Sequence, residues 1–204
     1  MSNKGLKFHP QALSTAEVEA LMAACSPTSP TGKRNRALIV TLWRGALRCD
    51  EALQLQPHDL DPVTGAIRIM HGKGNRARTV AIEPRAWAVI EVWLAARKER
   101  SVPRSAPVFC TLAGRPLNAR YVRWMMTDLG VKAGIGKRVH AHGLRHSRAA
   151  EMRREGKDVL VISHALGHSN VGTTQRYIEH LYPDEVLKAM LDSEWGHQGS
   201  GPEP

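Results

Sequence analysis

Three things are scarce in this sequence of 204 residues: cysteines, long apolar runs and, between residues 68 and 123, acidic side chains. Cys25, Cys49 and Cys110 are odd in number, widely spaced and form no Cys-x-x-Cys pair, which argues against a disulfide framework or a zinc site and favours a reducing cytosol. No apolar run reaches the roughly 18 residues of a membrane span, and the polar start lacks a secretory signal. We therefore expect a soluble, cytoplasmic protein with no membrane partner.

Positive charge, by contrast, is abundant. The chain has 29 Lys and Arg against 19 Asp and Glu, a formal net charge of +10, and 42% hydrophobic residues, enough for a core. Between residues 68 and 123 the acids are Glu83, Glu91 and Glu99, while basic residues are frequent. A globular domain with this charge is expected to bind a polyanion, because Lys and Arg neutralise phosphates and release counterions. Charge alone leaves DNA, RNA and an acidic membrane surface open.

Apolar spacing and helix-end signals predict a chain that is mostly helical. Ser14 and Glu17 form a capping box that opens a helix to about residue 24, and a loop rich in Pro and Ser is expected at 26–32. Pro84 is placed to begin another helix at its first position. Further helices are expected at about 37–43, 50–55, 117–132, 143–155, 158–166, 171–180 and 183–192.

Two short segments alternate apolar and polar residues instead. Residues 66–71 and 77–82 have the period of strands, and Gly72-Lys-Gly-Asn75 between them is a tight turn. The expected fold class is α+β, mostly helical, with a small antiparallel β-sheet of two or three strands inserted between helices. We expect three segments along the chain: a leader or linker at 1–13, a domain at 14–195 and a flexible tail at 196–204.

Histidines are concentrated near the end of this domain. The pairs His142/His146 and His164/His168 have the i, i+4 spacing that can bind zinc on a helix face. Neither pair has the glutamate that follows the first histidine in the metalloprotease motif, and no cysteine lies nearby. A metal hydrolase is therefore the weakest hypothesis, and we expect neither a metal nor a cofactor.

The same region suits phosphodiester chemistry better. That chemistry needs a nucleophile, cations on the non-bridging oxygens and an acid for the leaving oxygen. A tyrosine hydroxyl can attack, arginine matches phosphate with a planar fork, and histidine can move a proton near neutral pH. Tyr177 alone, however, is more often a packing residue, and composition cannot show that these groups meet.

Several blocks together resemble the tyrosine recombinases, the phage integrase family, in the family's order. They cover about residues 14–190. The matching blocks are GALR at 45–48 with Glu51, the lysine hairpin GKGNR at 72–76, HGLRHS at 142–147, and LGH at 166–168 followed by TTQRY at 173–177. Each block alone is weak, but their joint occurrence is specific.

The resemblance implies a site-specific recombinase or integrase and gives roles to five residues here. Tyr177 would attack the scissile phosphate, which leaves a 3′-phosphotyrosyl link and a free 5′-hydroxyl. Arg48 and Arg145 would bind the non-bridging oxygens. His168 would donate a hydrogen bond to the phosphoryl group, and His142 would accept or position the proton of the tyrosine.

It also implies a hairpin and a partner. Lys73 would protonate the leaving 5′-oxygen, Arg76 and Arg78 would join it in binding DNA, and Glu51 would be the buried acid that supports the site. The reaction is an isoenergetic transesterification, so neither metal nor ATP is required. Double-stranded DNA is the implied partner, with a tetramer assembled on it and a nucleoid-associated location.

Two departures from the family pattern are visible. Ala46 stands where the family often has glycine, and Asp50 where it often has serine. About 13 residues precede the domain, whereas most full-length members carry a DNA-binding domain there, so we expect a naturally short member, an excised domain or a remnant. A type IB topoisomerase-like enzyme and a DNA-binding regulatory module that does not cut remain alternatives. Among the other histidines, His146 and His164 are interpreted as structural, and His140, His180 and His197 as solvated.

Overall fold

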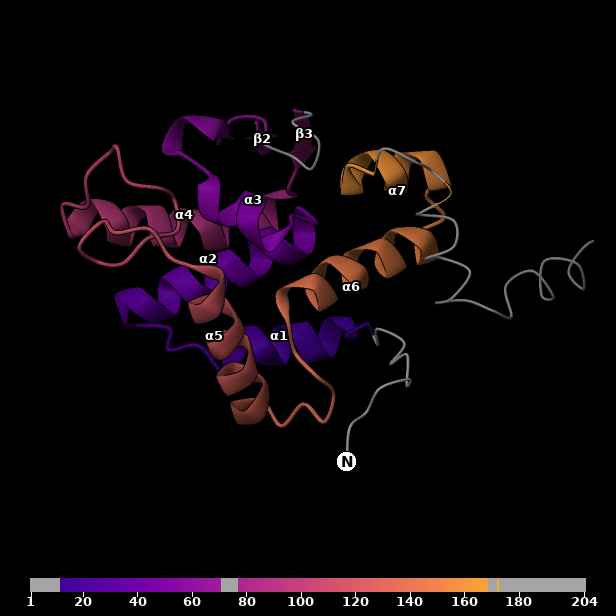
Figure 1. The fold of residues 1–204 in the computed structure, drawn as a ribbon, viewed down its shortest axis with the longest axis horizontal. Helices are drawn as coiled ribbons and strands as arrows, with labels where there is room; N and C mark the ends of the chain where they lie inside the picture. Colours follow the sequence, from indigo (N-terminus) through magenta and orange to yellow (C-terminus); the bar gives the residue numbers. More distant parts are fainter. Residues whose placement is uncertain (1–11, 71–76, 169–171, 173–204) are drawn as a thin grey trace, which may run out of the picture.

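The structure, a computed structural model, describes residues 12–70, 77–168 and 172. Helices dominate these ranges, and a small sheet joins them (Figure 1), as the α+β class predicts. The helices are α1 (Thr15–Ala23), α2 (Pro30–Arg44), α3 (Cys49–Gln54), the 3-10 turn η1 (Pro57–Asp59), α4 (Pro84–Glu99), α5 (Ala119–Lys132), α6 (Ala141–Arg154) and α7 (Val159–Leu166). The helices predicted at 171–180 and 183–192 lie outside the described residues except for Gly172, and the segment boundaries stay a prediction.

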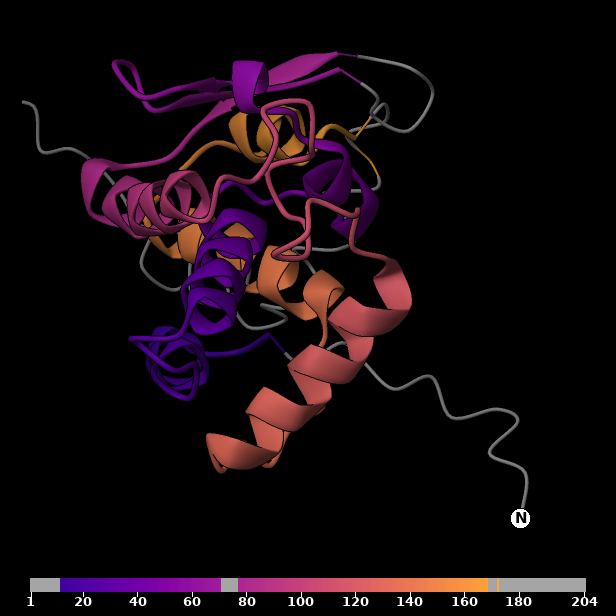
Figure 2. The ribbon, with the colours of Figure 1, turned by 90° about the vertical axis from the view of Figure 1, so that its left-hand side faces the viewer.

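The predicted antiparallel pairing is confirmed, with three strands of the two or three predicted, while the predicted turn at 72–75 lies outside the described residues. The strands β1 (Leu60–Asp61), β2 (Ala66–Ile69) and β3 (Arg78–Ala81) pair antiparallel in the order β1-β2-β3. Ile67 and Ile69 of β2 turn inward because side chains alternate along a strand. The sheet runs along one edge of the molecule, with α7 beside it in both views (Figure 2). The hairpin connecting β2 to β3 therefore starts next to α7.

Helix starts follow their capping side chains. Ser14 and Glu17 form the predicted capping box, since the Ser14 hydroxyl accepts from the Glu17 amide at 3.1 Å and the Glu17 carboxylate accepts from the Ser14 amide at 2.7 Å. The prediction of a loop through residue 32 is wrong in its last part. Ser29 caps α2 through the Gly32 amide at 3.0 Å, and Pro30 takes the first helical position, where its missing N–H costs nothing.

The main core forms around α2. This helix packs against α4 on one side and α6 on the other, and Trp93 of α4 is fully buried with its indole N–H on the Val108 carbonyl at 2.8 Å. A second, smaller cluster ties α6 and α7 to the turn after α2. It consists of Ala46, Ala149, Met152, Ile162 and Leu166.

The basic residues do not all face solvent. Arg97, in the basic stretch, is 7% exposed and donates to the Pro103 carbonyl at 2.9 Å, so the expected cationic surface is smaller than the sequence indicates. Leu13 is 2% exposed, and its amide donates to the Ser147 hydroxyl at 2.8 Å, so the predicted leader reaches the core at its last residue. None of the described helices is long and apolar enough to span a bilayer.

Candidate active site

The guanidinium of Arg145, on the second turn of α6, is enclosed by backbone carbonyls. Nη1 donates to the carbonyl of Ala46 at 2.7 Å, and Nη2 donates to the carbonyl of Leu166. The residue is 2% exposed. Ala46 precedes Arg48 by two residues, and Leu166 precedes His168 by two. Arg145 therefore holds together the two segments that carry these other predicted catalytic residues.

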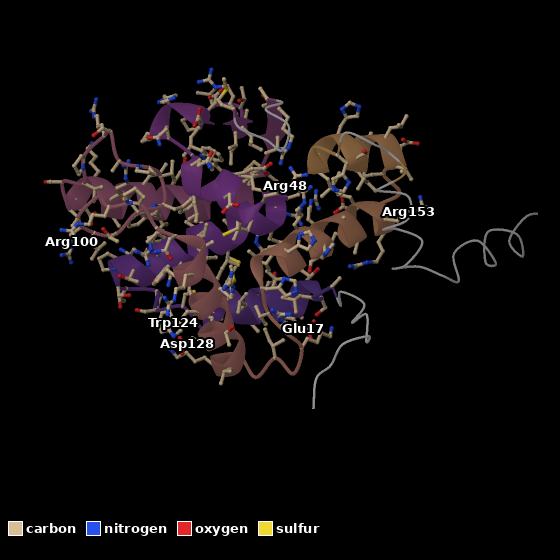
Figure 3. All side chains as sticks on the ribbon, viewed as in Figure 1. Glu17, Arg48, Arg100, Trp124, Asp128 and Arg153 are labelled. Atoms are coloured by element: carbon tan, nitrogen blue, oxygen red, sulfur yellow. The ribbon has the colours of Figure 1, made fainter. Side chains whose placement is uncertain are left out.

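Arg48 is the N-cap residue of α3 and lies beside a buried carboxylate. Its Nη1 donates to Glu51 Oε1 at 2.7 Å, its amide donates to Glu51 Oε2 at 2.8 Å, and its Nη2 reaches the Gly167 carbonyl at 3.3 Å. Figure 3 shows nitrogen-rich side chains gathered near Arg48 between α3, α6 and α7. The Arg48 side chain keeps 27% of its surface exposed, whereas that of Glu51 keeps 3%. Arg48 is thus the solvent-facing member of the pair.

Arg78, which the sequence predicts as a DNA contact, directs its guanidinium at a buried carboxylate in the structure. Its Nη1 and Nη2 donate to the two oxygens of Glu51 at 2.8 and 2.7 Å, and its Nε reaches the Ala165 carbonyl at 3.4 Å. The side chain is 11% exposed. Arg78 shares the inward face of β3 with Val80, because residues two apart on a strand point the same way. This alternation is the signal in the sequence that could have indicated its direction.

The charges around Glu51 keep it ionised. Burial alone would raise the pKa of this carboxyl, but the hydrogen bonds from Arg78 and the Arg48 amide, together with the Arg78 charge, lower the pKa to about 2. The Glu51 carboxylate therefore carries its negative charge at any working pH.

The same surroundings disfavour the charged form of His168 and His142. Burial and then the charges of Arg145, Arg48, His142 and Arg78 lower the pKa of His168 to about 4. Burial, followed by the Arg145 charge, also lowers the pKa of His142. A place that disfavours added positive charge favours an anion. A neutral imidazole can still donate one hydrogen bond through its N–H and accept one at its other ring nitrogen.

His142 and His146 pack ring against ring. Their centroids are 4.0 Å apart with an edge-to-face angle of 70°, and the His140 ring stacks on His142 at 6.4 Å. Burial and then the charges of His142, His140, Arg145 and His168 lower the pKa of His146 to about 3. His140, interpreted from the sequence as solvated, instead caps α6 by accepting from the Gly143 amide at 3.0 Å. A histidine cap is an uncommon choice, which is why composition did not indicate it.

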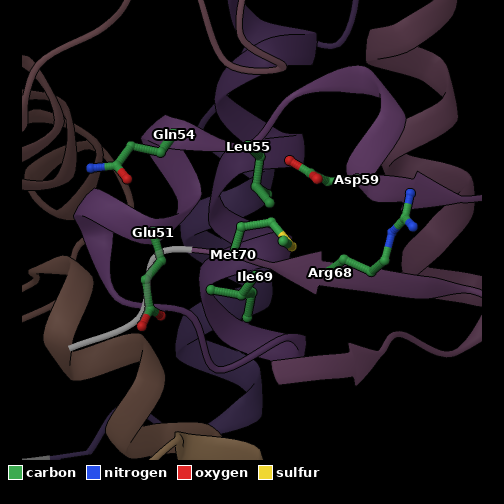
Figure 4. A pocket seen from close by; sticks show the side chains of 7 residues that line it. All are labelled: Glu51, Gln54, Leu55, Asp59, Arg68, Ile69 and Met70. Atoms are coloured by element: carbon green, nitrogen blue, oxygen red, sulfur yellow. The ribbon is translucent and has the colours of Figure 1, made fainter. Parts of the chain in front are cut away.

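The described residues show no group of three or more His, Cys, Asp or Glu that could hold a metal. Two acids, Glu51 and Asp59, line a small pocket against β2 with Arg68 and Met70 (Figure 4). Their carboxylates lie on opposite sides of this pocket. The absence of a metal from the reaction stays a prediction.

Three of the predicted site residues, Lys73, Arg76 and Tyr177, lie outside the described residues. The four other predicted catalytic residues converge: Arg145 bonds to the carbonyls two residues before Arg48 and His168, and His142 is one turn from Arg145 on α6. The hairpin that carries Lys73 and Arg76 emerges from the Ile69–Arg78 pair, beside Glu51. Their catalytic roles remain predictions at this point.

Two backbone features that the motifs did not reveal shape the site. Ala46 has φ 50 and Gly167 has φ 59, both in the left-handed region. The left-handed conformation costs an alanine roughly 1–2 kcal/mol. At Ala46 this conformation accompanies a carbonyl that accepts a hydrogen bond from Arg145. Gly167 also has to lack a side chain, because a Cβ at this position would lie 2.9 Å from the Cδ, Cζ and Nε atoms of Arg78.

Replacing Gly167 with alanine is therefore expected to cost more stability than the backbone conformation alone explains. Gly156 is a matched control, because it has φ 73 and nothing within 4 Å of an added Cβ. We expect about 1 kcal/mol for Gly156→Ala and roughly 1–2 kcal/mol more for Gly167→Ala, measured by urea unfolding. Equal losses in the two variants would show that the Arg78 contact has no energetic weight.

Comparison with known proteins shows the family to which the chain belongs. The model of the phage integrase family matches residues 11–183. The chain therefore belongs to the phage integrase family, as the motifs predict.

Two curated relatives illustrate how much of a longer protein is matched. Tyrosine recombinase XerC of Halalkalibacterium halodurans is 34% identical over 189 residues, which are 90% of this chain and 62% of that protein. Tyrosine recombinase XerC 2 of Ralstonia nicotianae is 35% identical over 83% of this chain and 50% of that protein. The chain thus spans less than two thirds of the length of these relatives.

Solved structures share the fold. The XerA recombinase superposes with a TM-score of 0.78 at 25% identity, covering 96% of this chain and 68% of that one. XerH site-specific recombinase, bound to palindromic difH substrate in a post-cleavage complex, gives 0.73 at 26% identity, covering 94% of this chain and 55% of that one. The Tn1549 transposon integrase, at 18% identity and a TM-score of 0.74, shows the same fold.

Proposed function

We propose that this chain is the catalytic part of a site-specific DNA recombinase or integrase that cleaves and rejoins strands through a 3′-phosphotyrosyl intermediate. The observation that supports this most directly is the convergence of Arg48, His142, Arg145 and His168 in surroundings that favour an anion. Membership of the phage integrase family supports the same chemistry.

In this proposal the Tyr177 phenol oxygen attacks the phosphorus, the bond from phosphorus to the 5′-oxygen breaks, and a 3′-phosphotyrosyl ester forms. His142 accepts or positions the phenol proton, and Lys73 supplies a proton to the leaving oxygen. Arg48, Arg145 and His168 stabilise the charge on the non-bridging oxygens, as preorganised donors do in other transfer reactions. One ester bond replaces another, so neither a metal nor ATP is needed.

The partners follow from the same proposal. The substrate is double-stranded DNA, with Lys73 and Arg76 of the hairpin as cationic contacts. XerH, a structural relative, was solved on its difH substrate, which supports a duplex. Four copies assembled on paired DNA sites would exchange strands, and the protein would work at the nucleoid in the cytoplasm.

Replacing Tyr177 with phenylalanine is expected to abolish covalent attachment to DNA and leave DNA affinity within roughly threefold, because only the nucleophilic oxygen is lost. The measurement uses labelled duplexes, drawn from a pool of sequences, with a nick that releases a short fragment on cleavage and so prevents religation. Wild type and variant are incubated with EDTA and resolved on a denaturing gel.

A wild-type band that survives detergent and disappears in Tyr177→Phe supports the proposal. Loss of the wild-type band in EDTA, with recovery on added metal, would contradict it. If DNA binds but no covalent product forms even after fusion to a relative's DNA-binding domain, the chain is a regulatory module. Relaxation of plasmid without a target site would favour the topoisomerase-like alternative.

A further inference from the structure

Arg78 is a predicted DNA contact whose side chain is nearly buried in the structure. It starts β3, directs both terminal nitrogens at Glu51 and keeps 11% of its side chain exposed. We propose that Arg78 is a positioning residue that neutralises Glu51, so that the positive charge of Arg48 stays available to the scissile phosphate. This inference rests on the proposed function and adds to it a residue that acts through others.

The argument begins with the charges that share one carboxylate. Glu51 accepts from the guanidinium of Arg48 at 2.7 Å and from both terminal nitrogens of Arg78 at 2.8 and 2.7 Å. Two guanidiniums and one carboxylate leave the cluster with a net charge of +1. Without Arg78 the remaining Arg48–Glu51 pair would be neutral. A phosphodiester carries one negative charge, so a neutral pair would attract it less and would stabilise the transition state less.

The exposures show which member of the cluster faces a ligand. The side chains of Glu51 and Arg78 are 3% and 11% exposed, while that of Arg48 is 27% exposed. The two inner members thus form a nearly buried pair. Because pairs away from water are screened little, the compensation of Glu51 by Arg78 acts at close to full strength on Arg48.

A second set of contacts links Arg78 to the loop that carries His168. Its Nε donates to the Ala165 carbonyl at 3.4 Å. Its Nε and Cζ would be only 2.9 Å from a Cβ placed on Gly167, so Arg78 lies directly against the Gly167 backbone. Arg48 donates to the carbonyl of the same Gly167 at 3.3 Å. Arg78 pairs with Ile69, the last pair of β2 and β3 before the connection that contains Lys73, so one side chain links the end of this strand pair to Arg48 and to the segment before His168.

The competing role is direct contact with a DNA phosphate. A phosphate contact contributes to the salt dependence of binding, and its removal reduces the slope by about one. A positioning residue leaves that slope unchanged and affects the chemical step after DNA is bound. The two roles are therefore separable by measurement.

The test compares Arg78→Gln, Glu51→Gln and the double variant. Arg78→Gln takes the cluster charge from +1 to zero, and adding Glu51→Gln returns it to +1. We expect Arg78→Gln to slow covalent complex formation at saturating nicked DNA roughly 10- to 100-fold, with unchanged DNA affinity and salt slope. The double variant is expected to recover most of that loss. Arg100→Gln, an exposed arginine at the end of α4 (Figure 3), is the matched control.

The rescue is the outcome that a merely structural role would not produce. A double variant that folds, by circular dichroism and urea unfolding, but stays as slow as Arg78→Gln would overturn the proposal. So would weaker DNA binding with a smaller salt slope and a normal rate at saturation. If Arg78→Gln fails to fold, the double variant decides alone, because it leaves no unpaired charge at Glu51 and should fold and cleave.

A second readout separates this inference from the proposed function. Inorganic phosphate is titrated against each protein while NMR follows the His168 ring. We expect weaker phosphate binding in Arg78→Gln and recovery in the double variant, because inorganic phosphate is attracted by the charge of the site alone, whereas duplex DNA is held by many other phosphate contacts. We also expect a higher His168 pKa in Arg78→Gln, since burial and then charges that include Arg78 lower it. If wild type forms no covalent DNA product but this pattern holds, the recombinase proposal fails and the Arg78 inference stands. Equal phosphate affinity in all variants overturns the inference.

Discussion

Arg145→Ala is expected to lose roughly 3–5 kcal/mol of folding stability and at least about 10³-fold in the rate of DNA cleavage. The stability loss follows from burial. The guanidinium donates to the Ala46 and Leu166 carbonyls and is 2% exposed, so its removal leaves both carbonyls without this donor and opens a cavity. Each unsatisfied buried carbonyl costs about 1–3 kcal/mol.

The loss of cleavage has two sources in this variant. A direct phosphate contact would disappear, and the segments that carry Arg48 and His168 would lose the side chain that joins them. Arg145→Lys separates the sources, because lysine keeps the charge but is a point donor without the planar fork. We expect Arg145→Lys to be intermediate in stability and still strongly impaired in cleavage.

Urea unfolding and covalent trapping on nicked duplexes measure the two effects. Arg138→Ala, an exposed arginine in the loop before α6, serves as the control for loss of one positive charge. If Arg145→Ala unfolded at the wild-type urea concentration, the bridging role would be wrong. If it also cleaved at the wild-type rate, Arg145 would have no part in the site.

The sequence predicted the helices best where their ends carry a side-chain signal. The Ser14 capping box and Pro84 at the start of α4 were both read correctly. The start of α2 was missed because Pro30 and Gly32 suggested a loop, although Ser29 before a proline is an equally good helix start. The residue types at 29–32 are compatible with a loop and with a helix start, and the packing of α2 at the centre of the core selects the helix start.

For the site, motifs located residues but not their contacts. Arg145 was predicted as a phosphate ligand, whereas its described bonds are to backbone carbonyls of Ala46 and Leu166. Every residue has a carbonyl, so no sequence pattern indicates which ones converge. The inward direction of Arg78 could have been predicted from its register with Val80, but its pairing with Glu51 depends on how the sheet lies against α3.

The domain is also expected to lose stability steeply as pH falls from 6.5 towards 4. The pKa values of His146 and His168 are lowered from 6.5 to about 3 and about 4. In the unfolded chain both histidines take up protons near pH 6.5, while the folded state keeps them neutral. The unfolded state then binds more protons, so stability falls with falling pH. His140 and His142, whose pKa values burial also lowers, act in the same direction.

The pH range of the stability loss distinguishes the contribution of the histidines from that of Glu51. Glu51, with its pKa lowered from 4.5 to about 2, contributes stability that is complete above pH 4.5 and is lost only below it. Between pH 6.5 and 4.5 the histidines therefore dominate. Each proton bound in excess by the unfolded state changes stability by about 1.4 kcal/mol per pH unit, so His146 and His168 together predict a slope of roughly 2–3 kcal/mol per pH unit near pH 5.

Urea unfolding at pH 7.5, 6.5, 5.5 and 5.0 measures this slope. His146→Phe keeps an aromatic ring against His142 and removes one titrating group, so it should reduce the slope by about 1.4 kcal/mol per pH unit. His58→Gln is the control, since the His58 side chain is 77% exposed. Inorganic phosphate should reduce the slope as well, because an anion beside Arg48 offsets the positive charges that, after burial, lower the His168 pKa. A stability that stays constant from pH 6.5 to 5.0 would mean that these histidines are solvated, and that the arginines do not meet at His168.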